Sequence, residues 1–258
     1  MNSAAFNLTG RVAVVIGGTS GIGRTLALGL AQAGADVVAC GRRAEEGAAV
    51  AAEIEQLGRK SLRVTADVCA RASLEQLLDR TLSAFDKVDI LVNSAGKTKR
   101  MPTLELSEEE WTDILDTNLT GTLRACQVFG RHMLQRGYGR IVNIASLGSF
   151  VALHEVAAYC ASKAAVASLT KSLAVEWGAR GVNVNAIAPG VFRTALNHAL
   201  LEGSERGREF LLRTPLKRFG SIDELSAACV FLASEASSFV NGEVMVVDGG
   251  FLASGVNQ

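Results

Sequence analysis

The regular alternation of apolar strand-like runs with helix-like segments is the feature that most limits the folds open to this chain. Seven short runs rich in Val and Ile are separated by stretches whose apolar residues recur at helical spacing. The predicted strands are residues 11–18, 35–40, 61–68, 88–93, 139–146, 182–190 and 242–250. The predicted helices are residues 22–34, 44–57, 73–85, 107–133, 157–177 and a last one that follows a capping box at 221–224 and ends near 233. Repeated βαβ units with right-handed crossovers give a parallel sheet covered on both faces. We therefore expect an α/β fold: a single Rossmann-type, doubly wound, seven-stranded parallel sheet flanked by helices, over residues 1–258.

The amino-acid composition limits the cellular compartment and the kinds of partner expected for this protein. The 258 residues carry 26 basic and 26 acidic side chains, which predicts no nucleic-acid partner and no anionic membrane surface. The five cysteines are widely spaced and form no CxxC pair, which disfavours a disulfide framework or a metal site. The N-terminus lacks a signal-peptide pattern, and no apolar run approaches the ~20 residues that span a bilayer. We expect a cytoplasmic protein.

A glycine-rich loop, GGTSGIG at residues 17–23, lies between the first predicted strand and the first predicted helix. Glycines at this place permit a tight turn and let the backbone approach a pyrophosphate, which the positive end of the helix dipole favours. The loop therefore predicts dinucleotide binding by Gly17, Thr19, Ser20, Gly21, Ile22 and Gly23. An ordinary strand-to-helix turn is the alternative.

The end of the second predicted strand bears on the choice of cofactor. NAD binding favours an acidic residue there, but the sequence is Cys40-Gly41-Arg42-Arg43. A guanidinium fork suits the 2′-phosphate of NADP. Arg42 and Arg43 therefore favour NADP(H), although NAD(H) stays open because both arginines could simply begin a solvated helix.

Tyr159 and Lys163 are four residues apart, so they share one face of a predicted helix. A free tyrosine has a pKa near ~10, and an adjacent ammonium favours its ionised form. We expect Lys163 to lower the Tyr159 pKa enough for acid–base chemistry on an alcohol or ketone. Ser146 ends the strand before this helix and is expected to hold the substrate oxygen.

These motifs together resemble the short-chain dehydrogenase/reductase family, from about Leu8 to Gly250. The resemblance implies that Asn118, Ser146, Tyr159 and Lys163 form the catalytic set, with Asn118 anchoring a water that relays the proton and Lys163 also bonding the nicotinamide ribose. Further cofactor contacts are implied for Asp67, Val68, Asn93, Ala95, Gly96, Tyr159, Lys163, Pro189, Gly190, Val191 and Thr194. Two positions depart from the family pattern: Ile16 replaces a Thr and Ser94 replaces an Asn. The departures put in doubt a hydrogen bond that ties the cofactor loop to the fourth predicted strand.

The resemblance implies hydride transfer between NADP(H) and a secondary alcohol or ketone. The segments around Tyr159 and at the C-terminus are similar to those of bacterial gluconate, polyol and sugar-acid dehydrogenases, so a sugar, polyol or sugar acid is the expected substrate. The alternatives are a 3-oxoacyl-carrier-protein reductase and a dinucleotide-binding protein without turnover. Residues expected to shape the substrate pocket are Leu147, Ser149, His154, Glu155, Val191 and a flap over about 191–220 with His198, Arg208 and Arg213.

The family resemblance also implies a homotetramer. Its interface would use the two long helices at about 107–133 and 157–177, together with the last helix and strand. On the second long helix, the apolar residues expected to suit this interface are Ala165, Ala167, Leu169, Leu173 and Trp177.

Overall fold

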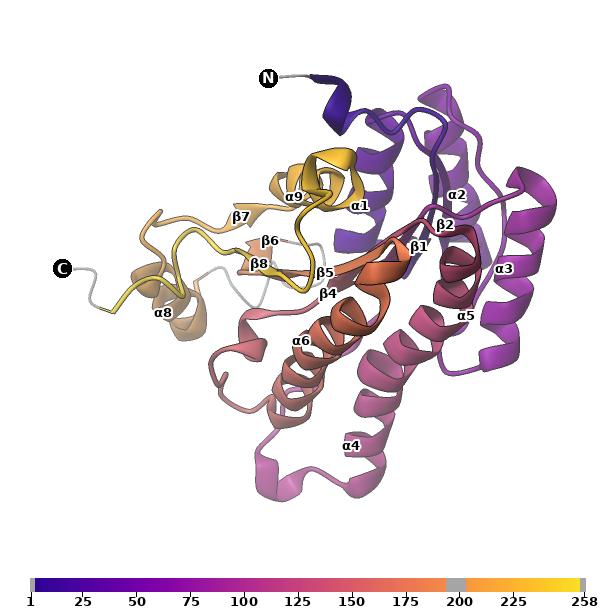
Figure 1. Ribbon diagram of the computed structural model, residues 1–258. Coiled ribbons are helices and arrows are strands. Elements are labelled where there is room, and N and C mark those ends of the chain that lie inside the picture. Colours follow the sequence, from indigo (N-terminus) through magenta and orange to yellow (C-terminus); the bar gives the residue numbers. More distant parts are fainter. Residues whose placement is uncertain (1–2, 194–202, 256–258) are drawn as a thin grey trace.

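The centre of the protein is a six-stranded parallel sheet. A computed structural model describes residues 3–193 and 203–255. The sheet order is β2-β1-β3-β4-β5-β8, so the chain turns back at β1 and the two halves of the sheet grow in opposite directions (Figure 1). The strands are β1 Val12–Ile16, β2 Asp36–Cys40, β3 Ile90–Asn93, β4 Gly139–Ile144, β5 Val182–Pro189 and β8 Val244–Val247. All residues of β1, β3 and β4 are buried, and those of β1 are apolar on both faces of the sheet.

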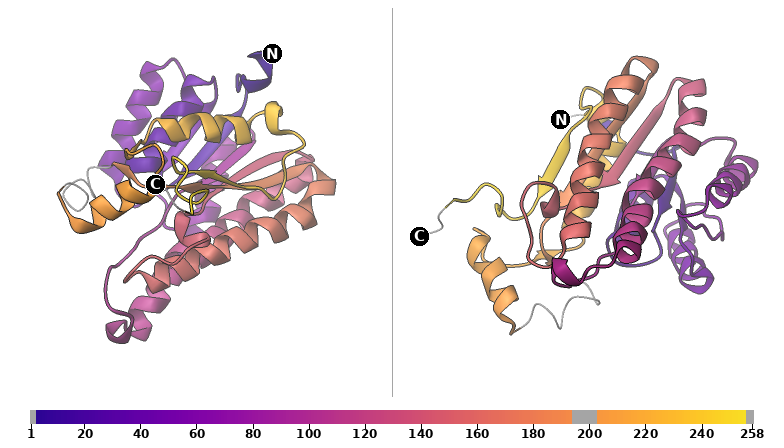
Figure 2. Two further views of the ribbon diagram at one scale, coloured as in Figure 1. Left: turned by 90° about the vertical axis from the view of Figure 1, so that its left-hand side faces the viewer. Right: turned by 90° about the horizontal axis from the view of Figure 1, so that it is seen from below.

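Helices cover both faces of the sheet, as the sequence predicts. The helices are α1 Gly21–Gln32, α2 Ala44–Gln56, α3 Arg71–Phe85, α4 Glu108–Leu115, α5 Gly121–Arg136, α6 Ala157–Trp177, α8 Glu205–Arg213 and α9 Glu224–Ala233. One apolar core lies between the sheet and α1, α2 and α9. A second lies on the opposite face, under α3, α5 and α6. Figure 2 shows α5 and α6 side by side on that second face. Within the described residues, no helix is long and apolar enough to cross a membrane.

The predicted long helix from 107 to 133 contains an irregular turn. Ser107 caps its start by accepting a hydrogen bond from the Glu110 N–H at 3.2 Å, as the capping box predicts. A π-helical turn at Asp116–Thr120 then separates α4 from α5. Such a turn inserts one residue into a helix and often marks a functional site. Here it contains Asn118.

One of the seven predicted strands, at residues 61–68, does not form. The segment follows the free edge of β2 but shares only scattered hydrogen bonds with it. The Val37 N–H donates to the Lys60 carbonyl at 3.0 Å, and the Ala66 N–H donates to the Gly41 carbonyl at 3.0 Å. Between them the Ser61 hydroxyl, not a backbone N–H, bonds the Val37 carbonyl at 2.7 Å. A side chain thus replaces part of the ladder that a strand would need.

The stretch 191–220 carries no strand-like run in its sequence, yet a short strand forms at each end of it. Two short strands, β6 at Phe192–Arg193 and β7 at Gly220–Ser221, pair in parallel. They bring the two ends of the stretch together. Helix α8 lies between them, and the Phe210 ring on α8 lies 6.0 Å from that of Phe251 near the C-terminus. The two described ends of the stretch are therefore held side by side.

Candidate functional site

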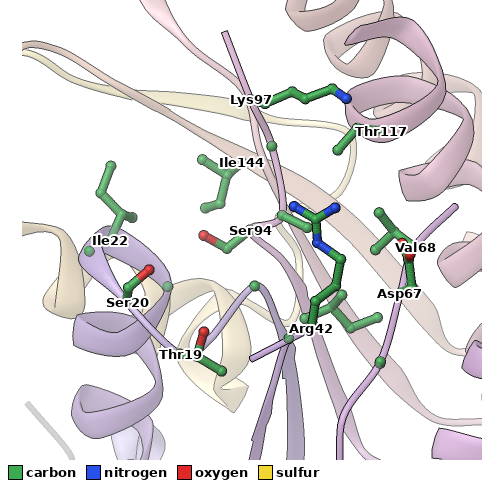
Figure 3. A pocket seen from close by; sticks show the side chains of 18 of the residues that line it. Thr19, Ser20, Ile22, Arg42, Asp67, Val68, Ser94, Lys97, Thr117 and Ile144 are labelled. Carbon is green, nitrogen blue, oxygen red and sulfur yellow. The ribbon is translucent and has the colours of Figure 1, made fainter. Parts of the chain in front are cut away.

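A cleft of about 450 Å³ opens at the carboxyl ends of β1, β2, β3 and β4 (Figure 3). This is the edge at which open α/β sheets bind their ligands. Most of the predicted cofactor residues line it, namely Gly17, Thr19, Ser20, Gly21, Ile22, Gly23, Arg42, Arg43, Asp67, Val68, Ala95, Gly96, Tyr159 and Lys163. The cleft thus joins the glycine loop to the Tyr–Lys pair.

Three of the four glycines in the loop differ in what surrounds them. A Cβ on Gly17 would lie 2.4 Å from the Ala95 nitrogen, and a Cβ on Gly23 would lie 2.0 Å from the Gly17 carbonyl oxygen. These two positions therefore let backbone touch backbone. Gly21 has a φ of +52° and nothing within 4 Å of its Cβ position, so a side chain there would project into the cleft. The empty space over Gly21, at the start of α1, fits a pyrophosphate.

A backbone hydrogen bond joins positions 16 and 94, where the residues differ from the family pattern. The Ser94 N–H donates to the Ile16 carbonyl at 2.8 Å. The loop after β1 is thus tied to the loop after β3 without the side chains that the family pattern provides.

Arg42 and Arg43 lie at the same rim but differ in their partners. The Arg43 guanidinium donates to the Ser20 hydroxyl at 2.9 Å and forms an ion pair with Glu46 at 3.1 Å. Within the described residues Arg42 has no such partner, and Figure 3 shows its guanidinium extending into the cleft. Arg42 is therefore the cation available to a ligand phosphate, whereas Arg43 is held to the protein.

Tyr159 is partly buried at the inner end of the cleft. Burial raises the pKa of its phenol, since water no longer stabilises the anion, while a hydrogen bond with Ser146 acts in the opposite direction. The expectation that Lys163 lowers the Tyr159 pKa is wrong, because burial raises it. The Lys163 Nζ lies 5.8 Å from the centre of the Tyr159 ring and donates its hydrogen bond to the Ile144 carbonyl.

Lys163 is almost completely buried, with 5% of its side chain exposed. Its Nζ donates a hydrogen bond to the Ile144 carbonyl at 2.6 Å, at the end of β4. Burial lowers the pKa of Lys163 from 10.5 to about 8. The ammonium that the predicted mechanism needs is thus itself destabilised by the site.

The Asn118 side chain is fully buried and fully engaged. Its Oδ1 accepts from the Lys97 N–H at 2.8 Å, and its Nδ2 donates to the Lys97 carbonyl at 2.9 Å and to the Ser162 hydroxyl at 3.0 Å. Both amide hydrogens are therefore used within the protein. The amide holds the loop after β3 in place and has no N–H left for a relay water.

Some predicted residues lie elsewhere. Asn93 is turned into the core, where its amide donates to Asn143 Oδ1 at 2.9 Å, so the structure does not place its side chain in the cleft. Gly190 packs closely against the Asp248 backbone, and Val191 lines a separate cavity of about 130 Å³. Pro189 ends β5 at the same edge of the sheet. Thr194 and His198 lie outside the described residues.

Sequence reasoning missed several residues that line the cleft. They are Gly41, Ala66, Cys69, Ser94, Lys97, Thr98, Thr117 and Ile144. Most are neighbours of predicted residues, and their places in loops after the strands were the available signal. Thr117 was hidden by the π-helical turn in which it lies, and Figure 3 shows its side chain at the cleft.

The residues expected at the substrate are divided between several places. The Ser149 hydroxyl donates to the Lys163 carbonyl at 2.7 Å, and Leu147 is buried. Glu155 pairs with Arg100 at 2.7 Å and has a left-handed backbone with φ of 63°. Arg208 is exposed. A second cavity of about 220 Å³ lies between the loop after β4 and α8, lined by residues that include His154, Arg206, Phe210, Arg213 and Phe251.

Comparison with known proteins places this geometry in a family. A protein-family model described as enoyl-(acyl carrier protein) reductase matches residues 16–252. The chain is 43% identical over 246 residues to a D-threitol dehydrogenase of Mycolicibacterium smegmatis, covering 95% of this chain and 94% of the relative. It belongs to the short-chain dehydrogenase/reductase family. It is also 41% identical over 249 residues to a gluconate 5-dehydrogenase of Gluconobacter oxydans, covering 96% and 97% of the two chains. A gluconate 5-dehydrogenase of Burkholderia cenocepacia, solved with NADP and tartrate, superposes with a TM-score of 0.94 at 38% identity, covering 99% of this chain and 100% of that one.

The different partners of the two arginines predict different effects on nucleotide binding. Replacing Arg42 by Ala should weaken NADPH binding by roughly ten- to hundredfold, because a charge-assisted hydrogen bond contributes roughly 1.5–3 kcal/mol. NADH binding should change little. Arg43→Ala is the matched control and should weaken the binding of NADPH and of NADH by similar, smaller factors. Titration of both nucleotides by fluorescence measures these constants, and equal losses of NADPH and NADH affinity in Arg42→Ala would contradict the assignment.

Burial of the Lys163 ammonium predicts a pH-dependent stability. Between the folded pKa of about 8 and the unfolded value of 10.5, the unfolded chain binds more protons, so stability rises with pH in this window. Lys163→Met removes the buried charge. The parent should therefore gain roughly 3 kcal/mol of unfolding free energy over the variant between pH 7 and pH 10.5, since each pKa unit is worth about 1.4 kcal/mol. Urea denaturation at several pH values tests this, and a difference that is constant with pH would refute it.

Proposed function

We propose that this protein is an NADP(H)-dependent oxidoreductase that interconverts a secondary hydroxyl group and a ketone on a polyol, sugar or sugar acid. One observation carries the proposal: Tyr159 and Lys163 line the same cleft as the glycine loop and Arg42. A group able to exchange a proton therefore lies in the cleft that fits a dinucleotide. The dehydrogenases of threitol and gluconate among its relatives support the substrate class.

The proposed chemistry assigns one task to each residue of the site. Bound NADP⁺ supplies the hydride acceptor. Tyr159 takes the proton of the substrate hydroxyl in oxidation and returns it in reduction, as a general base and acid. Ser146 is 7% exposed, and its hydroxyl, which accepts from the Gly148 N–H at 3.1 Å, orients the substrate oxygen. Lys163 supplies positive charge and ribose contacts, and Asn118 fixes the loop that forms the opposite wall.

The choice of NADP(H) over NAD(H) depends on Arg42. A 2′-phosphate needs a cation that is not already paired, and Arg42 meets this condition among the described residues at this rim. The Burkholderia gluconate 5-dehydrogenase solved with NADP agrees with this preference. No carboxylate follows β2 to bond a free 2′-hydroxyl, since the residues there are Gly41, Arg42 and Arg43.

The second cavity supports a polar substrate. Arg206, His154 and the Arg213–Glu209 ion pair supply polar groups, while Phe210 and Phe251 supply apolar walls. Such a lining suits a carbon chain that carries hydroxyl or carboxylate groups. We propose that the stretch 191–220, which includes α8, forms the substrate side of the site.

Substitution of the two tyrosines tests the proposed base. Tyr159→Phe should reduce turnover of the active substrate by at least about 10³-fold, because proton transfer is lost, with NADPH affinity within about twofold of the parent. Tyr138→Phe is the control, because its hydroxyl bonds Glu235 at the opposite end of the sheet, 2.9 Å away, and its turnover should be unchanged. To identify the active substrate, oxidation of D-gluconate, D-threitol and glycerol is assayed with NADP⁺ and with NAD⁺, and reduction of 5-keto-D-gluconate is assayed with NADPH. The absorbance of the reduced nicotinamide gives the rate. Retained activity in Tyr159→Phe would refute the role.

We further propose a cytoplasmic homotetramer. Most of the α6 residues predicted for the interface face inward: Ala167 and Leu173 are buried, and Leu169 and Trp177 pack against the core. The outward side of α6 instead carries Val175, which is 84% exposed in the single chain. Five free cysteines are consistent with a reducing compartment. Light scattering should give four times the 27.1 kDa of one chain, and a monomer mass would contradict the assembly.

A further inference from the structure

The Ser162 hydroxyl lies fully buried between two residues of the proposed site. It accepts a hydrogen bond from Asn118 Nδ2 at 3.0 Å and donates one to the backbone carbonyl of Tyr159 at 2.7 Å. Its side chain has 0% exposure. We propose that Ser162 is a positioning residue that fixes Tyr159 relative to the loop after β3, and this inference rests on the function proposed above.

The direction of every hydrogen bond in this network is determined. The Lys97 N–H must meet Asn118 Oδ1, and the Lys97 carbonyl must meet Asn118 Nδ2, so the amide cannot rotate by 180° without opposing like groups. The second hydrogen on Nδ2 then needs an acceptor. Ser162 is that acceptor, and its own hydrogen is directed to the Tyr159 carbonyl. The loop after β3, the π-helical turn and α6 are joined into one buried unit.

This unit surrounds the groups proposed to react. A Cβ on Gly96 would lie 3.3 Å from Asn118 Oδ1 and 3.6 Å from Lys163 Nζ, so the amide and the ammonium flank one glycine of the cleft wall. Ser162 precedes Lys163 in the chain and bonds the Tyr159 backbone. Loss of the hydroxyl leaves a buried N–H of Asn118 unpaired and lets the first turn of α6 shift. Displacements of about 1 Å at a reacting group can slow chemistry by about a hundredfold.

The same helix provides a matched control. The Thr170 hydroxyl accepts from Asn143 Nδ2 at 3.0 Å and donates to the Val166 carbonyl at 2.8 Å, and Thr170 is also 0% exposed. The bonding pattern is that of Ser162, about two turns further along α6. Removing either hydroxyl leaves one buried asparagine N–H without an acceptor. Only the loss at Ser162 affects the turn that carries Tyr159.

The experiment compares Ser162→Ala, Ser162→Thr and Thr170→Val with the parent, using whichever of D-gluconate or D-threitol the parent oxidises with NADP⁺. Ser162→Ala and Thr170→Val should lower the melting temperature by similar amounts. Ser162→Ala should lower kcat by about ten- to hundredfold with the NADPH Kd within about twofold. Thr170→Val should keep the parent kcat, and Ser162→Thr, which retains the hydroxyl, should turn over faster than Ser162→Ala.

Three results would overturn the inference: a parental kcat in Ser162→Ala, an equal loss of kcat in Thr170→Val, or a kcat in Ser162→Thr at or below that of Ser162→Ala. In all three the parent is active, so the proposed function stands. A parent that binds NADPH but oxidises neither substrate and does not reduce 5-keto-D-gluconate would refute the proposed substrate class, and the positioning role with it.

Discussion

The contact between the loops after β1 and β3 is the constraint on which the site depends. Their backbones approach so closely at Gly17 and Ala95 that no side chain fits between them. The same loops share the bond from the Ser94 N–H to the Ile16 carbonyl. At this point the wall of the cleft is therefore held by main-chain contacts.

The π-helical turn is the second constraint. An α-helix advances by about 100° per residue, so one inserted residue turns the following helix face by that amount. The turn at Asp116–Thr120 lets α4 and α5 each pack as a regular helix while Asn118 is directed inward. The Asn118 amide then bonds both backbone groups of Lys97. An uninterrupted helix could not satisfy the packing of α5 on the sheet and this contact together.

The sequence predicts most of the fold and the centre of the site, because both depend on local patterns. Apolar runs identified the six strands, the glycine spacing identified the cleft, and the four-residue spacing placed Tyr159 and Lys163 on one face of α6. What could not be predicted depends on distant contacts. The Ser61 hydroxyl replaces a ladder bond beside β2, and β6 needs β7 as a partner 28 residues away. Ser162 looked like any small residue of an Ala-rich helix until Asn118 was seen against it.

The direction of the Tyr159 pKa shift could not be predicted from the sequence either, and it affects which form of the phenol is present. Spacing alone favoured a lowered pKa, but it says nothing about water, and burial destabilises both the phenolate and the Lys163 ammonium. A raised pKa favours the neutral phenol, which is the form that donates a proton in ketone reduction. Oxidation needs the phenolate, and the positive ring of an oxidised nicotinamide would favour that form.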